Sequence, residues 1–111
     1  MDFAVLSAYT EDCMEVAEHE LGSWYVFTEG EDIYLDVRTG LFGYGFWLLL
    51  LLNQEEALGY KQSRKAFIKL LVQKILQRPH FYFMRNAPIE KQKVAFDALT
   101  AWRQGPRRPK V

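Results

Sequence analysis

The chain has 111 residues with 14 basic and 14 acidic side chains, so its formal net charge is zero. Half of the residues are hydrophobic and 15% are aromatic, which supplies the core of one domain and excludes a disordered, collagen-like or disulfide-stapled chain. The charges are segregated: residues 1–56 hold twelve acidic side chains and one basic one, whereas residues 57–111 hold thirteen basic and two acidic ones.

A helix is predicted over residues 10–21. Thr10 is a good N-terminal capping residue, and the acidic residues that follow it suit the positive end of the helix dipole. Cys13, Ala17 and Leu21 recur every four residues and give this helix an apolar stripe. Because Cys13 is the only cysteine, an internal disulfide and a cysteine-based zinc site are excluded.

Three antiparallel strands are expected next, over 23–28, 33–38 and 42–52. The first segment is rich in aromatic and β-branched residues, and a turn at 29–32 joins it to the second. The third segment is apolar without alternation, which predicts a strand that is covered on both faces or central in the sheet. The second segment alternates, so that Ile33, Leu35 and Val37 face one way and Tyr34, Asp36 and Arg38 the other.

The sequence shows no membrane or export signal. The apolar run 41–52 has twelve residues, whereas a membrane-spanning helix needs about 20. The N-terminus lacks the positive start and the long apolar stretch of a signal peptide. We therefore expect a cytoplasmic protein that does not enter the membrane and that keeps its thiol reduced.

A long helix is predicted over 54–77. Asn53 caps its start, Gly59 is the expected kink, and Pro79 is expected to end it. Five residues form its core stripe, namely Tyr60, Phe67, Ile68, Leu71 and Ile75. The segment 80–85 is expected to be a short strand or an apolar loop.

The last helix is predicted over 88–103, starting at Pro88. Its inward stripe is Ala95, Leu99 and Trp102, with Phe96 near it. Residues 105–111 are expected to form a flexible, basic tail.

The predicted fold class is therefore α+β, with the order α-β-β-β-α-(β)-α. We expect a three- to four-stranded antiparallel meander with the helices packed on one face of the sheet. Residues 1–104 are expected to form a single domain.

Arg64 falls near the middle of the apolar stripe of the long helix. Two interpretations are open. In the first, Arg64 forms an ion pair with a carboxylate of the sheet, Asp36 most obviously, and ties the helix to the sheet. In the second, Gly59 shifts the phase of the helix and Arg64 is simply exposed.

No catalytic motif or phosphate-binding glycine loop is present, and we expect no enzymatic activity and no cofactor. Glu15, Glu18 and His19 lie within about one turn of the predicted first helix, a spacing at which side chains can ligate a metal. A solvated acidic face explains them as well. Because no second helix supplies matching ligands, we expect no metal site.

Three binding hypotheses remain. Aromatic anchors inside an acidic rim are typical of a protein-binding surface, and the candidate residues are Trp24, Tyr25, Glu29, Glu31, Asp32, Tyr34 and Asp36. The alternative is a nucleic-acid-binding surface on a basic patch formed by Lys61, Lys65, Lys69, Lys74 and Arg78. The third hypothesis is a homo-oligomer whose acidic and basic halves pair between subunits.

Several short motifs are spread along residues 24–102. They are Tyr34-Leu35-Asp36, Leu52-Asn53-Gln54-Glu55-Glu56, Tyr60, Leu70-Leu71, Arg78-Pro79 and Arg85-Asn86. In this layout the chain resembles the immunity proteins of bacterial contact-dependent and polymorphic toxin systems. The resemblance implies a cytoplasmic, non-enzymatic protein that binds and blocks one cognate toxin. It assigns no binding residues.

Overall fold

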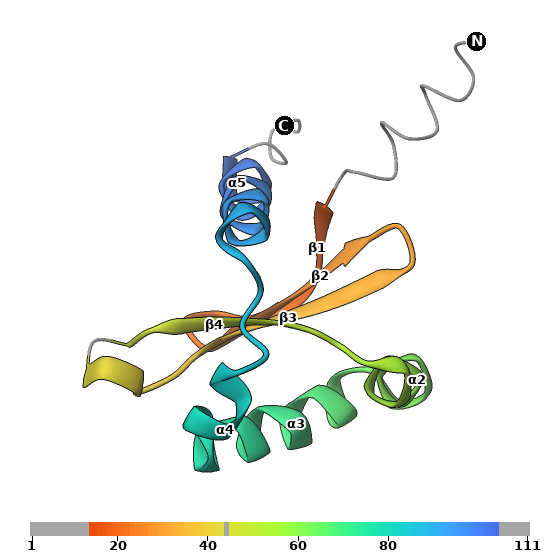
Figure 1. Cartoon of the computed structure of the whole chain (residues 1–111). Helices are drawn as coiled ribbons and strands as arrows, with labels where there is room; N and C mark the ends of the chain where they lie inside the picture. The colour runs from red at the N-terminus through yellow and green to blue at the C-terminus, as the bar shows by residue number, and fades with distance from the viewer. Residues whose placement is uncertain (1–13, 44, 105–111) are drawn as a thin grey trace, which may run out of the picture.

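The computed structural model describes residues 14–43 and 45–104, and it is built around a four-stranded antiparallel sheet (Figure 1). The strands are β1 (Met14–Glu20), β2 (Trp24–Glu29), β3 (Asp32–Arg38) and β4 (Trp47–Leu51). They follow one another across the sheet in chain order. The α+β class and the antiparallel meander are thereby confirmed.

The helices lie on both faces of the sheet, so the expectation that they pack on one face is wrong (Figure 1). They are the 3-10 turn η1 (Leu41–Gly43), α2 (Gln54–Ser63), α3 (Lys65–Gln77), α4 (Pro79–Phe83) and α5 (Ile89–Gln104). The helices α2 and α3 cover one face, and α5 covers the other. Both faces need cover because the strands carry large apolar side chains on each side.

The first described element is a strand where a helix was expected over 10–21. β1 pairs with β2 in antiparallel register, with His19 opposite Tyr25 and Glu20 opposite Trp24. Gly22 has a φ of 78° and lies in the tight turn between the two strands rather than at a helix end. Tertiary pairing with the aromatic β2 has overridden the local helical pattern. Thr10 and Cys13 lie outside the described residues.

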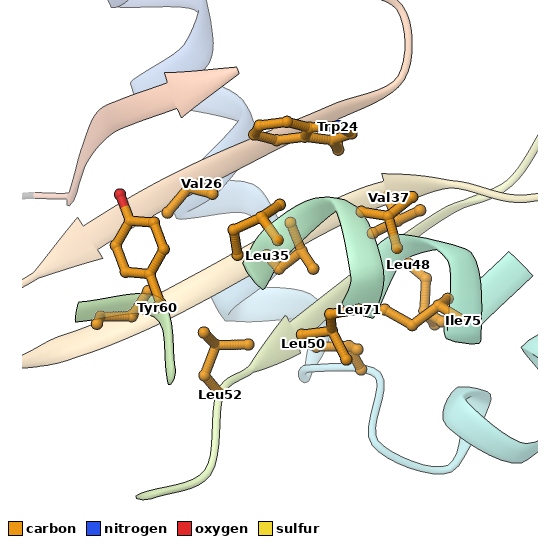
Figure 2. Close-up of a cluster of buried hydrophobic side chains, with 13 residues drawn as sticks. Trp24, Val26, Leu35, Val37, Leu48, Leu50, Leu52, Tyr60, Leu71 and Ile75 are labelled. Carbon is orange, nitrogen blue, oxygen red and sulfur yellow. The ribbon is translucent and has the colours of Figure 1, made fainter. Parts of the chain in front are cut away.

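The larger core lies between the sheet and the pair α2 and α3 (Figure 2). β2, β3 and β4 each present alternate side chains to it, as their period of two requires. Its buried members on the sheet include Trp24, Val26, Leu35, Val37, Leu48 and Leu50, and its helical members are Tyr60, Ile68, Leu71, Val72 and Ile75. The predicted stripe of the long helix is confirmed, with Phe67 packed at its margin.

The second core lies under α5 and uses the opposite side chains of the same strands. Its buried members are Met14, Tyr25, Phe27, Tyr34, Leu49, Ala87 and Ala95. Leu99 and Trp102 pack against this cluster, as predicted, whereas the side chain of Phe96 is 67% exposed. The alternation predicted for 33–38 is confirmed, since Leu35 and Val37 belong to the first core and Tyr34 to the second.

The predicted long helix is interrupted at Arg64 rather than kinked at Gly59. Arg64 has a φ of 52° and a ψ of −127°, which ends α2 and starts α3 in a new direction. Gly59 instead permits close packing, because a Cβ there would lie 2.5 Å from the ring of Phe67. Both helices nevertheless contribute buried side chains to the same core.

A glycine at the break should stabilise the fold. The backbone of Arg64 is strained for a residue with a Cβ, a conformation that costs about 1–3 kcal/mol. We expect Arg64→Gly to raise the free energy of unfolding in urea by about 1 kcal/mol. Arg64→Ala keeps the strain and also loses the guanidinium contact, so it should not raise the stability. A glycine variant no more stable than the alanine variant would contradict the strain.

Two other boundaries differ from the sequence predictions. Pro79 begins the short helix α4, so residues 79–83 form neither a strand nor a loop. After α4 the chain runs along β4, where Asn86 forms an isolated bridge with Leu50 and its Oδ1 accepts a hydrogen bond of 3.0 Å from the amide of Leu49. The edge of β4 is thereby covered.

The strand predicted over 42–52 starts only at Trp47. η1 precedes it, and Thr39 holds this turn by donating its hydroxyl to the carbonyl of Phe46 over 2.8 Å. Within the described ranges, none of the helices combines the length and the apolar character that a membrane crossing requires. The proposed tail 105–111 lies outside those ranges.

Candidate functional site

The three aromatic residues predicted as partner-binding anchors are buried. Trp24 is 2% exposed and faces α2 and α3, whereas Tyr25 and Tyr34 lie on the other face of the sheet, at 1% and 5%. Burial raises the pKa of the Tyr34 hydroxyl above its ordinary value. These rings therefore belong to the two cores and not to an exposed protein-binding surface.

Of the three acidic residues at the hairpin turn between β2 and β3, one is held in an ion pair and two are exposed. Glu29 accepts a hydrogen bond of 2.8 Å from the ammonium of Lys91 on α5, and its side chain is only 9% exposed. Lys91 also lies 5.9 Å from the ring centroid of Tyr34. Glu31 and Asp32 are exposed at the tip of the turn. The turn therefore presents two free carboxylates on a base that an ion pair holds in place.

These two carboxylates line a groove between the hairpin turn and α2. The groove has a volume of about 470 Å³. Leu58 on α2 lines it and is 55% exposed, and Lys61 lies on the same lining. The sequence pattern missed Leu58, because its position outside the helical core stripe is typical of a solvated side chain. We call this surface the acidic groove, defined by Glu31, Asp32, Ile33, Leu52, Asn53, Gln54, Ala57, Leu58 and Lys61.

Asp36 lies apart from the acidic groove, on the face of the sheet that α5 covers. It lines a cavity with Tyr25, Trp47 and Leu49. Burial raises the pKa of its carboxyl from 3.8 to about 7. Asp36 is therefore a partly buried acid on the face that α5 covers and not a member of an exposed binding rim.

The expected ion pair between Arg64 and Asp36 is wrong, because the sheet separates the two residues. Arg64 is exposed on the side of α2 and α3, and its guanidinium carbon lies 5.0 Å from the ring centroid of Tyr60. The second interpretation, exposure, is confirmed, although its cause is the helix break and not Gly59.

The side chains of Glu18 and His19 on β1 do not converge. Glu18 is opposite Val26, which faces α2 and α3, whereas His19 is opposite Tyr25 and stacks on its ring at 5.8 Å. The two side chains therefore point to opposite faces of a strand. No cluster of three or more potential metal ligands is found over 14–43 and 45–104.

The residues of the alternative basic patch are exposed but divided. Lys61 lies on α2 at the acidic groove, and the break at Arg64 separates it from α3. At about 100° per residue, Lys65 and Lys69 lie on one flank of the buried stripe of α3 and Lys74 lies on the other. The guanidinium of Arg78 lies 5.3 Å from the ring centroid of Phe81. A nucleic-acid backbone would find no continuous row of these cations.

The acidic and basic halves of the sequence meet inside the fold. Arg85 donates to both carboxylate oxygens of Glu56, over 3.0 and 2.7 Å, and to the carbonyl of Leu51 over 3.0 Å. Glu56 also completes a capping box with Asn53 at the start of α2. Burial opposes ionisation of Glu56, but the hydrogen bonds from Arg85 and Asn53 outweigh it and hold its pKa below the ordinary value. Together with Glu29–Lys91, this pair ties the two halves of the chain to each other.

Removing the Glu56 carboxylate should destabilise the protein. We expect Glu56→Gln to lower the free energy of unfolding by about 2 kcal/mol, because a partly buried guanidinium loses its bidentate partner. Asp97→Asn is the matched control, since Asp97 is exposed and 3.7 Å from Lys93. The control variant should lose less than about 0.5 kcal/mol of the free energy of unfolding. Equal losses in urea titrations of the two variants would show that the Glu56 pair is an ordinary surface contact.

No protein-family model, curated protein or solved structure matches the chain in comparisons with known proteins.

Proposed function

We propose that this chain is a non-enzymatic protein-binding module that receives a basic surface of one cognate protein in the acidic groove. We further propose that it is an immunity protein, whose partner is a bacterial toxin. The observation that carries the binding role is the placement of Glu31 and Asp32, both exposed, beside the exposed side chain of Leu58. The resemblance of residues 24–102 to immunity proteins supports the choice of partner.

The chemistry of the acidic groove suits a partner with a basic rim and an apolar side chain. Carboxylates steer the approach of a basic protein and select against an acidic one. The exposed leucine adds apolar surface that becomes buried in the complex. Each Å² of apolar surface buried contributes about 25 cal/mol to the free energy of binding. The ion pair between Glu29 and Lys91 already holds the base of the turn in place. The entropy cost of ordering the turn when a partner binds should therefore be small.

The alternatives fit the structure less well. A nucleic-acid surface needs clustered cations, and the helix break and the two flanks of α3 divide the lysines. Self-association through opposite charges needs free charges in both halves. The pairs Glu56–Arg85 and Glu29–Lys91 already use four of these charges within one chain.

Co-expression with the product of the adjacent gene tests the proposal. If that product is a toxin, its expression alone should arrest growth, and this chain should restore it. Purified, the two proteins should form a complex by isothermal titration calorimetry. The double variant Glu31→Lys/Asp32→Lys should weaken binding at least tenfold and abolish protection.

A charge-matched variant provides the control. Glu20 and Asp97 are exposed, and Glu20 lies at the opposite end of the β1–β2 pair from the hairpin turn. Glu20→Lys/Asp97→Lys should bind and protect as the wild type does. An adjacent product that neither binds nor harms the cell would overturn the immunity role. A complex that tolerates the groove variant as well as the control would overturn the acidic groove as its contact surface.

A further inference from the structure

A second surface of the molecule, remote from the acidic groove, has the make-up of a small-molecule site. A cavity of about 370 Å³ lies between the sheet and α5. Its floor is formed by Tyr25, Asp36, Trp47 and Leu49, which come from three neighbouring strands. Ligand pockets in proteins have volumes of about 300–1,000 Å³ and combine apolar walls with a few polar groups. This cavity lies at the small end of that range.

The position of α5 explains why the space exists. Among the other helices and strands, α5 makes its main contacts with β1, which lies at one edge of the sheet. The β3 and β4 side of the floor is therefore covered only in part. Residues of one face of α5 form the roof, and one of them, Ala95, is a small and buried side chain. Phe96 stands at the margin with 67% of its side chain exposed.

Asp36 is the polar group that the cavity leaves without a counterpart. Its neighbours across the sheet are Tyr25 on β2 and Leu49 on β4. Over the described ranges, no hydrogen bond or ion pair to its carboxylate is found, and burial is the one cause of the raised pKa. Even a partly buried carboxylate is costly to ionise when no partner is at hand. A ligand that supplies a cation would remove that cost.

The other charged and titratable groups around the cavity are few. Arg103 on α5 lines it and donates to the hydroxyl of Tyr25 over 3.2 Å. The ring of His19 on β1 stacks on Tyr25 from outside the lining. β4 contributes only Trp47 and Leu49. Arg103 at the margin disfavours a second positive charge there, which selects a monoamine over a polyamine.

We propose that this cavity binds a small organic monoamine, with the ammonium on the Asp36 carboxylate and an apolar body against Trp47 and Leu49. The ammonium provides the charge-assisted donors that the carboxylate lacks. Aromatic rings on the floor add a favourable surface for a cation. The volume of the cavity suits a body of one aromatic ring. This site does not depend on the acidic groove or on a toxin partner.

Titration of the full chain with phenethylamine at pH 8, followed by two-dimensional NMR, tests the proposal. Saturable shifts are expected at the indole N–H of Trp47 and at the amides of Leu49 and Ala95. 2-Phenylethanol has the same body without the charge and should bind at least tenfold more weakly. Because the carboxylate is protonated below its pKa, the affinity for phenethylamine should also fall at least tenfold at pH 5.

Two kinds of variant distinguish the loss of the binding site from a general effect on folding. Asp36→Asn keeps the shape of the side chain and should weaken phenethylamine binding at least tenfold. Ala95→Leu fills the cavity from the roof and should also abolish binding, whereas Ala101→Leu, at an exposed position of α5, should leave it unchanged. The proposal is overturned if the wild type shows no saturable shift at 20 mM amine, if Asp36→Asn binds as the wild type does, or if the alcohol binds equally well.

Discussion

Asp36→Asn should raise the free energy of unfolding at pH 8 by about 2–4 kcal/mol and leave it nearly unchanged at pH 4. Burial raises the pKa of this carboxyl to about 7 in the folded protein, from an ordinary value of 3.8. Between these values the folded state holds a proton that the unfolded state has lost. The stability of the wild type must therefore fall as the pH rises through this window, by at most about 1.4 kcal/mol per pH unit.

Urea titrations of the wild type and the variant at several pH values from 4 to 8 measure this effect. The difference between the two proteins should grow with pH and level off above the folded pKa. Asp97→Asn is the control, since Asp97 is exposed on α5, and its difference from the wild type should stay flat across this range. A difference for Asp36→Asn that does not change with pH would mean that the carboxyl is hydrated in the folded state.

Leu71→Ala should lower the free energy of unfolding by about 2–5 kcal/mol. Leu71 is 5% exposed and packs in the core between the sheet and α3, as Figure 2 shows. Its removal leaves a cavity that the rigid sheet cannot close. Leu70 is the matched control, because the same side chain one position earlier is 60% exposed. Leu70→Ala should change the stability by less than about 0.5 kcal/mol.

Thermal or urea denaturation of the two alanine variants decides the orientation of α3. Equal losses would indicate that α3 is rotated or loosely docked. A larger loss for Leu70 than for Leu71 would place the opposite face of the helix against the sheet.

The parts of the fold that the sequence predicted correctly are those with a strong local signal. The strict alternation from Ile33 to Arg38 predicted which side chains share a face. Asn53 and the acidic residues after it predicted the start of α2, where the capping box is found. Pattern and structure agree there because the same residues satisfy both the local geometry and the burial.

The parts predicted wrongly depend on distant neighbours. The spacing of Ala17 and Leu21 suits an apolar helical stripe, but the open edge of β2 offers a ladder of backbone hydrogen bonds, and the segment pairs with it as β1. Arg64 breaks the long helix although no glycine or proline stands there. The contact between Gly59 and Phe67 across the two helices has no signature within a window of a few residues.

The candidate site was predicted in part. Glu31 and Asp32 lie exposed at the hairpin turn as expected. Trp24 and Tyr25 were predicted as surface anchors on the premise that one face of the sheet is free, and helices on both faces remove that premise. The large apolar side chain exposed at the acidic groove is instead Leu58, which comes from α2.

The segregated charge has two uses in this structure. Glu56–Arg85 and Glu29–Lys91 join the two halves of the sequence within the fold. Other charged residues are exposed, and those at the hairpin turn form the rim of the acidic groove. A net charge of zero therefore conceals both ion pairs that join the two halves of the chain and an exposed acidic turn.

Hydrogen–deuterium exchange on the complex with the adjacent gene product tests the proposed contact surface most directly. We expect slower exchange on binding in residues 30–33 and 53–61, the two segments that border the acidic groove, and no change along α3. Protection confined to α3, or to the β1 edge of the sheet, would contradict the account.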